Sequence, residues 1–420
     1  MTSRLYSLHF GRKTLAFTAP PGWEIDVAAG RQTLSPYDDD ETRMPYSYDE
    51  AIRRAERVVI VFTDATRSSP DRELAGRVLR TLVKRGVAEN QIAFLCAVGM
   101  HRPSTMKEKL AKLGPEIVER FPVYDHDPTQ VMTIGEIDGI PVQVNARLVE
   151  PGTLVVALGV VEPHQYAGYS GGAKTVVIGC GGPDTIAATH GPRYLDHPGT
   201  RLGNIEGNPF QQFVRQAGRM IGLRWVNNVI LNSNNEVVDQ WSGPPDIVHD
   251  ALVARARRLY EVPVAAPYDV VIAGVGAPKD ANLYQASRAA TYIGLSSRPV
   301  IRPGGVIIMA ASMPEGAGQG AGERNFIAAL RRNNDLTAMM EEMRQVGCRP
   351  GEQRAYMLAQ LLTRYRVIVV GARDADLIQA AHLTPAASMD EALALAQQWS
   401  GGPARGLLVS HALQTIPVPA

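Results

Sequence analysis

The sequence predicts an α/β protein with two domains, each built around a largely parallel sheet. Three observations predict this class. Short runs of β-branched residues recur along the chain, a helix-like stretch follows most of these runs, and 420 residues exceed the usual size of one domain. Sheets of this kind bind ligands at the carboxyl ends of their strands. The residues that follow each predicted strand are therefore the first candidates for a functional site.

The predicted elements follow one another in order along the chain. The N-terminal residues predict a pair of strands joined by a turn that contains Gly11. Further strands are expected at residues 57–63, 91–98, 153–161, 269–275, 305–310 and 366–370. Helices are expected around residues 72–85, 104–113, 183–190 and 245–260.

A domain boundary is expected near residue 262. The helix that ends at Tyr260 is followed by a proline-rich joint, Glu261–Pro267, before a new strand begins. Residues 1–262 are predicted to form an N-terminal α/β domain, and residues 263–420 a C-terminal α/β domain. We expect the active site in the cleft between the two domains.

The composition indicates which partners and which cellular compartment to expect. With 43 Lys and Arg against 42 Asp and Glu, the net charge of +1 gives no electrostatic reason to bind nucleic acid or an anionic membrane. No apolar run approaches the roughly 20 residues of a transmembrane helix, and the N-terminus lacks the apolar core of a secretory signal. The 3 cysteines lie far apart and match no zinc spacing. We expect a soluble cytoplasmic protein with a small-molecule ligand, and a homo-oligomer is left open.

Polar side chains follow the first two predicted strands after the N-terminal pair. Asp64 and Arg67 come directly after the strand at 57–63, where a carboxylate and an anion-binding guanidinium would face a ligand. Helix capping explains the neighbouring Asp71, but it does not explain Arg67. His101 follows the strand at 91–98 and is either a general base or a loop histidine bonded to the backbone.

The densest motif, Glu162–Lys174, follows the strand at 153–161. Gly171 and Gly172 allow a ligand to approach the backbone closely, and successive N–H groups of such a loop can bind a phosphate. Lys174 is then either a phosphate contact or a covalent nucleophile with a lowered pKa. The alternative is a tight turn with a solvent-exposed lysine. The order of residues excludes a Walker A loop.

Two further segments are candidates. His190 closes a predicted helix before Gly-Pro, which helix capping explains well, and a metal role would need partners. Gln285 and Arg288 are three residues apart after the strand at 269–275 and would share a helix face. Together they could bind a carboxylate.

The spacing of these residues resembles the lactate racemase family of nickel-pincer-nucleotide enzymes. The family pattern has Asp-x-x-Arg, Gly-x-His-Arg-Pro and Glu-Pro-His, with Gly-Gly-x-Lys ten residues after that last histidine and a further histidine sixteen residues later. This sequence has Lys174 at ten residues from His164 and His190 at sixteen residues from Lys174. The later Tyr-Gln-x-x-Lys element appears as Tyr284-Gln285-Ala-Ser-Arg288.

The resemblance implies a role for each residue. Lys174 would hold the nickel-pincer nucleotide covalently, His190 would ligate nickel, and Gly171 and Gly172 would lie against the cofactor. His101 and His164 would be the acid/base pair. Arg67, Gln285 and Arg288 would bind the substrate carboxylate, with Asp64 on the cofactor or on Arg67. The implied partners are a 2-hydroxy carboxylate substrate and the enzymes that make the cofactor.

The implied reaction is racemisation or epimerisation of a 2-hydroxy acid through a 2-keto acid. The α-hydrogen leaves as hydride, because a carbanion beside a carboxylate would be unfavourable. A base is needed on each face of the substrate, which explains two histidines.

Two departures from the family pattern bear on the substrate. Ala173 stands where arginine is common, and Arg288 stands where lysine is usual. Since arginine and lysine are not interchangeable at carboxylate sites, we hypothesise a substrate other than lactate, such as a longer or dicarboxylic hydroxy acid.

Two alternatives remain at this point. One is a mononuclear zinc hydrolase that uses His101, His164 and His190 as ligands. The other is a relative that binds the cofactor without turnover.

Overall fold

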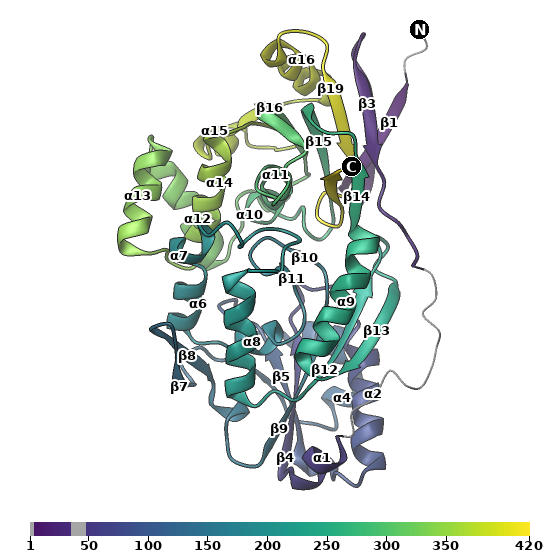
Figure 1. Cartoon of the computed structure of the whole chain (residues 1–420), viewed down its shortest axis with the longest axis vertical. Coiled ribbons are helices and arrows are strands. Elements are labelled where there is room, and N and C mark those ends of the chain that lie inside the picture. Colours follow the sequence, from purple (N-terminus) through teal and green to yellow (C-terminus); the bar gives the residue numbers. More distant parts are fainter. Residues whose placement is uncertain (1–3, 35–47) are drawn as a thin grey trace.

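A computed structural model describes residues 4–34 and 48–420 of the chain. The chain folds around two sheets that lie one above the other, with helices on their faces (Figure 1). Both sheets are mixed and mostly parallel. The predicted α/β class is confirmed.

The first sheet has six strands in the order β13-β12-β9-β4-β5-β6. Their bounds are Val237–Gly243 (β13), Trp225–Leu231 (β12), Thr153–Val160 (β9), Arg57–Thr63 (β4), Ile92–Ala97 (β5) and Val123–Asp125 (β6). All neighbours are parallel except β12 and β13. The chain leaves β4 toward β5 and β6 and then returns to β9 on the other side of β4. The order of strands therefore reverses between β4 and β9, where such sheets bind ligands.

The second sheet repeats this reversal around its own first long strand. It contains β15 (Tyr268–Gly276), β16 (Ile301–Ala310), β17 (Arg366–Val370), β18 (Thr384–Ala386), β19 (Arg405–Val409), β1 (Leu5–Gly11), β2 (Lys13–Thr18) and β3 (Glu24–Ala28). From β15 the chain moves outward through β16, β17 and β18, and β19 returns to pair with the opposite edge of β15. The carboxyl end of β15 is thus the second point of reversal.

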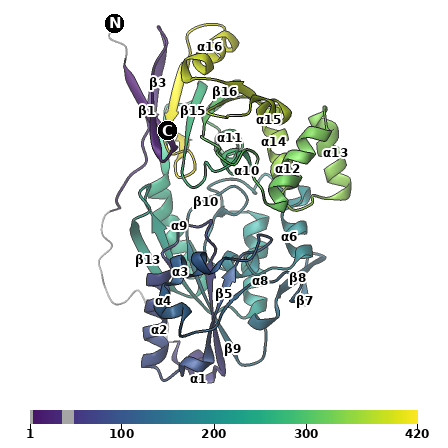
Figure 2. The same cartoon turned by 180° about the vertical axis from the view of Figure 1, so that it is seen from behind.

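Burial of both strand faces explains the continuous apolar runs. In β4, Ile60 and Phe62 pack against helix α2 (Asp71–Lys84), on the face that α2 shares with α3 (Met106–Leu113) and α4 (Pro115–Val118) (Figure 2). Val59 and Val61 belong to the core on the opposite face, with α8 (Pro209–Ile221) and α9 (Pro245–Tyr260). Parallel strands that are buried on both faces lose the apolar–polar alternation. This same core continues into the second sheet, so the two halves share one apolar interior.

Shorter elements complete the fold. Paired strands are β7 (Val131–Ile137) with β8 (Ile140–Asn145), β10 (Pro163–His164) with β11 (Gly168–Tyr169), and β14 (Glu261–Val264) with β20 (Ile416–Pro419). The other helices are α1 (Asp49–Arg54), α5 (Lys174–Val177), α6 (Pro183–Thr189), α7 (Pro192–Leu195), α10 (Leu283–Ala286), α11 (Arg288–Gly294), α12 (Ala321–Arg332), α13 (Leu336–Val346), α14 (Glu352–Leu362), α15 (Ala375–Ala380) and α16 (Met389–Ser400).

Strand pairing differs in one respect from the division expected at residue 262. The predicted N-terminal strand pair exists, but β1 pairs with β15 and β3 pairs with β19, so both belong to the sheet of the second half. Residues 1–262 therefore do not all lie with the first sheet. The physical reason is that β-pairing joins segments far apart in sequence. The local sequence pattern of a strand does not indicate which strand it will pair with. A boundary at residue 262 itself stays a prediction.

In the part of the chain that the structure describes, none of the helices has the length and apolar character to cross a membrane.

Candidate functional site

The two points of strand reversal meet at one site between the sheets. Side chains that follow β4, β5 and β9 come from the first sheet, and side chains that follow β15 come from the second. The β10–β11 loop lies between the two sheets (Figure 1). Two hydrogen bonds fasten this loop to α11, from the Tyr292 hydroxyl to the Pro163 carbonyl at 3.1 Å and from Thr291 Oγ1 to Gln165 Oε1 at 3.2 Å.

Asp64 holds His101 in a defined orientation. Asp64 Oδ2 lies 2.8 Å from His101 Nδ1, while Asp64 Oδ1 accepts hydrogen bonds from the N–H and hydroxyl of Thr66. Burial alone would raise the pKa of Asp64, but its interactions with His101, foremost the hydrogen bond, outweigh burial and lower the pKa to about 2. The carboxylate is ionised at neutral pH and accepts a hydrogen bond from the His101 Nδ1–H, which leaves His101 Nε2 unprotonated and able to act as a base. Asp64 was expected on Arg67 or the cofactor, and that expectation did not include His101. β4 and β5 are adjacent, so their loops meet.

Arg67 pairs with Glu162, which follows β9. The two side chains are 2.9 Å apart and both are mostly shielded from solvent. Burial would raise the pKa of Glu162, but Lys279, Arg67 and Arg288 together lower it. Glu162 is therefore an anion among several cations, and it neutralises part of their charge.

His164 is buried and has the opposite hydrogen-bond pattern to His101. Its Nδ1 accepts the N–H groups of Tyr166 and Ala167, at 3.3 and 3.2 Å. Burial, and then the charges of Lys174 and Arg67, hold the pKa of His164 well below its usual value. The neutral ring then carries its proton on Nε2 and presents a donor. The two histidines predicted as an acid/base pair are thus set in complementary tautomers.

Lys174 lies at the start of α5 and is 8% exposed. Within the described part of the chain, no residue accepts a hydrogen bond from its Nζ. Burial, followed by the charge of Arg67, lowers the pKa of Lys174 to about 7, although Glu162 opposes the shift. A large fraction of this amine is neutral near pH 7 and can act as a nucleophile.

His190 has one ring nitrogen, Nε2, without a hydrogen-bond partner among the described residues. Its Nδ1 lies 3.0 Å from the Ile186 carbonyl and 3.2 Å from Thr189 Oγ1, as expected for a histidine that ends a helix. Burial and the charge of Lys174 lower the pKa of His190 to about 3. A neutral imidazole whose Nδ1 proton is held by a carbonyl has Nε2 available for a metal.

The second sheet contributes cations and an amide. Arg288 is buried, and its Nη2 donates to Gln285 Oε1 at 2.8 Å. Lys279 Nζ donates to the Thr66 carbonyl at 2.9 Å and so bridges the two halves. Burial lowers the pKa of Lys279 to about 7 against the opposing charge of Glu162.

The glycines before Lys174 pack tightly against protein. Gly171 and Gly172 have φ of 88° and 57°, and a Cβ on Gly171 would meet Val161 Cγ2 at 2.5 Å. The Gly172 N–H donates to Asn228 Oδ1 at 2.8 Å. This N–H, expected to bind a phosphate, therefore has an acceptor within the chain. Contact of Gly171 and Gly172 with a cofactor stays a prediction.

The structure brings the predicted residues together and adds three. Glu162 stood in the motif but received no role, and Lys279 lies in the loop that follows the predicted strand at 269–275, where it could have been found. Arg354 lies on α14, far along the sequence, and its charge lowers the pKa of His190. No sequence pattern pointed to Arg354.

The fold and site define an α/β enzyme in which one exposed histidine, one buried histidine, a buried lysine with a lowered pKa and several arginines lie between two sheets. Comparison with known proteins agrees. Residues 43–203 match the family model for the lactate racemase N-terminal domain, and residues 264–416 match the model for the lactate racemase C-terminal domain. The chain belongs to the lactate racemase family.

Individual relatives and a solved structure extend the match. The chain is 30% identical over 349 residues to lactate racemase of Thermoanaerobacterium thermosaccharolyticum, covering 81% of this chain and 79% of the relative. Identity to lactate racemase of Lactiplantibacillus plantarum is 29% over 374 residues, covering 88% and 86%. The lactate racemase apoprotein structure from T. thermosaccharolyticum superposes with a TM-score of 0.86 at 25% identity, covering 99% of this chain and 100% of the other. These named relatives are isomerases.

A more distant solved structure shares the fold alone. A protein from Thermotoga maritima superposes with a TM-score of 0.67 at 18% identity, covering 89% of this chain and 97% of that protein.

The donor set fits a cofactor that brings most of its own metal ligands. Among the described residues, no three His, Cys, Asp or Glu side chains come together as a metal site, whereas a catalytic zinc site takes three protein ligands. His190 offers a single imidazole, and the nearby Lys174 amine has a pKa lowered to about 7. One imidazole with soft sulfur donors from an attached group suits nickel.

Proposed function

We propose that this chain racemises or epimerises a 2-hydroxy acid with a nickel-pincer nucleotide attached to Lys174. The observation that supports the proposal most directly is the Lys174 amine, which is buried, lies near His190 and has a pKa of about 7. A lysine with a purely electrostatic role would keep its charge through an ion pair.

Each residue of the chain then has a task. When bound, the cofactor would supply a hydride acceptor that takes the α-hydrogen and returns it. His101 would take the hydroxyl proton of one enantiomer on Nε2, with Asp64 holding the ring in place and stabilising its charge. His164 would give a proton from Nε2 to the substrate oxygen on the other side. For His164 to act as the base, its two bonds from Tyr166 and Ala167 must break, because both require an unprotonated Nδ1.

Arg67 and Arg288 would bind the substrate carboxylate. Gln285 orients the Arg288 guanidinium, and Glu162 orients that of Arg67. Lys279 ties the loop after β15 to the loop after β4, so it would keep the two halves of the site in register. The three cysteines are buried and unbridged, which supports a reducing, cytoplasmic compartment.

Co-expression with the cofactor-making enzymes tests the proposal. We expect an added mass on Lys174, about one nickel per chain, and interconversion of the enantiomers of a 2-hydroxy acid. α-Deuterated substrate should react more slowly and keep its deuterium. A Lys174→Arg control should carry neither mass nor activity. Rapid exchange of the deuterium with solvent would contradict hydride transfer.

Two other results would select the alternatives. Bound zinc without an added mass would favour a hydrolase. A loaded protein that turns over no 2-hydroxy acid would favour a binding relative.

A further inference from the structure

Among the residues that the structure describes, the buried cation Arg354 has no counter-ion. It lies on α14 and is 7% exposed. Its Nε and Nη1 atoms have no hydrogen-bond partner among the described residues. The ring of Tyr284, the residue before Gln285, lies under the guanidinium with its centroid at 4.4 Å. A cation–π contact stabilises the charge but leaves these N–H groups unsatisfied.

Arg354 differs in this respect from Arg255, which is buried, and from Arg67, which is partly buried. Arg255 forms an ion pair with Asp239, and Arg67 forms one with Glu162. Within the described residues, no carboxylate forms an ion pair with Arg354 or with Arg288. Because a buried charge needs a partner, these two arginines indicate a site for an anion that the chain does not provide.

Arg354 and Arg288 belong to the same cluster of charges. Arg354 lowers the pKa of Arg288, after the larger effect of burial, and it also lowers the pKa of His190. The groups near Arg354 that favour its charge are the phenols Tyr284, Tyr166 and Tyr292. The unsatisfied guanidinium therefore lies beside the proposed active site.

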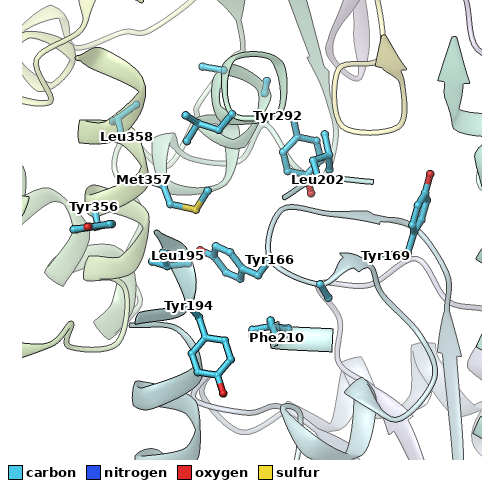
Figure 3. Close-up of a cluster of buried hydrophobic side chains, with 14 of the residues drawn as sticks. Tyr166, Tyr169, Tyr194, Leu195, Leu202, Phe210, Tyr292, Tyr356, Met357 and Leu358 are labelled. Atoms are coloured by element: carbon cyan, nitrogen blue, oxygen red, sulfur yellow. The ribbon is translucent and has the colours of Figure 1, made fainter. Parts of the chain in front are cut away.

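Tyr166 offers a further donor at the same place. Its hydroxyl is buried and has no hydrogen-bond partner among the described residues. Figure 3 shows the Tyr166 ring between Phe210 and Met357, with the hydroxyl turned toward α14. Guanidinium N–H groups and a phenol O–H all donate, which is the donor set of an oxyanion site.

We propose that Arg354, with Tyr166, binds a second carboxylate of the substrate, so that this chain prefers 2-hydroxy dicarboxylates to 2-hydroxy monocarboxylates. The inference rests on the proposed function. Arg67 and Arg288 face the carboxylate next to the reacting carbon, and Arg354 takes the distal one. The same donors would suit a phosphate, and the experiment separates that source.

Loaded wild-type enzyme is compared with Arg354→Met, using malate, 2-hydroxyglutarate and lactate as substrates. We expect wild-type kcat/KM to be at least about tenfold higher for one of the dicarboxylates than for lactate. Arg354→Met should lower that kcat/KM about a hundredfold, mainly through KM, because a buried charge pair loses one partner. Its kcat/KM for lactate should stay within about threefold of wild type, since lactate lacks the distal group.

Two further variants control for folding. Arg349→Met removes an exposed arginine that pairs with Glu352 at the start of the same helix, and it should not change the substrate preference. Arg354→Lys keeps the charge but loses the bidentate hydrogen bonding of a guanidinium. We therefore expect kcat/KM to fall about tenfold for the dicarboxylate and not for lactate. If Arg354→Met fails to fold, Arg354→Lys still tests the proposal. A calorimetric titration of unloaded protein with malate should give heat with wild type and none with Arg354→Met.

The outcomes are distinguishable. Equal losses on lactate and on the dicarboxylates, or a wild type that prefers lactate, overturn the inference and leave the proposed function standing. Loss of the added mass on Lys174 in Arg354→Met shows that Arg354 binds the cofactor phosphate, which also overturns it. A loaded wild type that turns over no 2-hydroxy acid refutes the proposed function itself.

Discussion

Asp64 and His101 form a carboxylate–imidazole pair at 2.8 Å, joined across the ends of two adjacent parallel strands. The ionised carboxylate fixes the proton on Nδ1 and directs Nε2 away from it. In enzymes with this arrangement, the carboxylate determines the tautomer of the base and stabilises its cation.

Asp64→Asn should therefore lower kcat by roughly a hundredfold or more, because the amide no longer enforces the correct tautomer. The matched control is Asp127→Asn. Asp127 accepts the same two bonds from Thr129 that Asp64 accepts from Thr66, but it lies outside the site. Steady-state kinetics on both variants check the prediction, and equal rates would refute a role for Asp64 in orienting His101.

Lys174 should react as an unusually acidic amine. With a pKa of about 7, lowered chiefly by burial, its neutral fraction rises through the neutral range instead of near pH 10. The measurement is the pH dependence of acylation of unloaded protein by an amine-reactive ester, read by peptide mass spectrometry. The exposed Lys107 serves as the internal control. A rate for Lys174 that rises in parallel with that for Lys107 would contradict the lowered pKa.

His190→Ala should separate metal binding from cofactor attachment. We expect the added mass on Lys174 to remain while nickel falls well below one per chain. The groups that contact His190 Nδ1, the Ile186 carbonyl and Thr189 Oγ1, cannot replace the lost Nε2 donor. His197→Ala is the control, because the only hydrogen bond that its ring makes among the described residues is from the Gly199 N–H. Nickel content is measured by metal analysis. Unchanged nickel in His190→Ala would remove His190 as the ligand.

Glu162→Gln should lower the free energy of unfolding, and the size of this loss should depend on pH. The charge of Glu162 is stabilised by Lys279, Arg67 and Arg288, so its folded pKa is lowered. The stabilisation that the ionised Glu162 contributes is fully present above the pKa of an unfolded glutamate. It is lost as the pH falls through the lower pKa that Glu162 has in the folded protein. Removing one partner of a largely buried pair costs about 3–5 kcal/mol.

Denaturant unfolding of Glu162→Gln at pH 7 and at successively lower pH measures this effect. The difference from wild type should shrink as the pH falls. Glu150→Gln breaks the more exposed pair with Arg57 and should cost less than about 1 kcal/mol. Equal losses of unfolding free energy in the two variants would show that the Glu162 charge stabilises the fold no more than an exposed ion pair does.

Much of the fold and site could be predicted from the sequence. Apolar runs that are buried on both faces predicted β4, β5, β9 and β15 to within one or two residues. The residues directly after these strands lie at the site because parallel strands bring their carboxyl ends to one edge. His190 ends its helix as capping rules predict.

Partners between distant segments could not be predicted. The pairing of β1 with β15 and of β3 with β19 joins residues more than 200 positions apart. The family resemblance implied that Asp64 acts on Arg67 or on the cofactor, whereas its bond to His101 depends on β4 and β5 being neighbours. Arg354 stands in an ordinary helical pattern, and its burial beside Tyr284 arises only when α14 packs on the second sheet.

The sequence by itself determined the α/β class, the family and the identity of most side chains at the site, because these depend on local periodicity and spacing. The tertiary structure alone decided how those side chains are paired: which carboxylate holds which histidine, which nitrogen of each imidazole is free, and which arginines have no counter-ion among the described residues. Burial and hydrogen bonding set protonation states, and both arise only when the two sheets pack together.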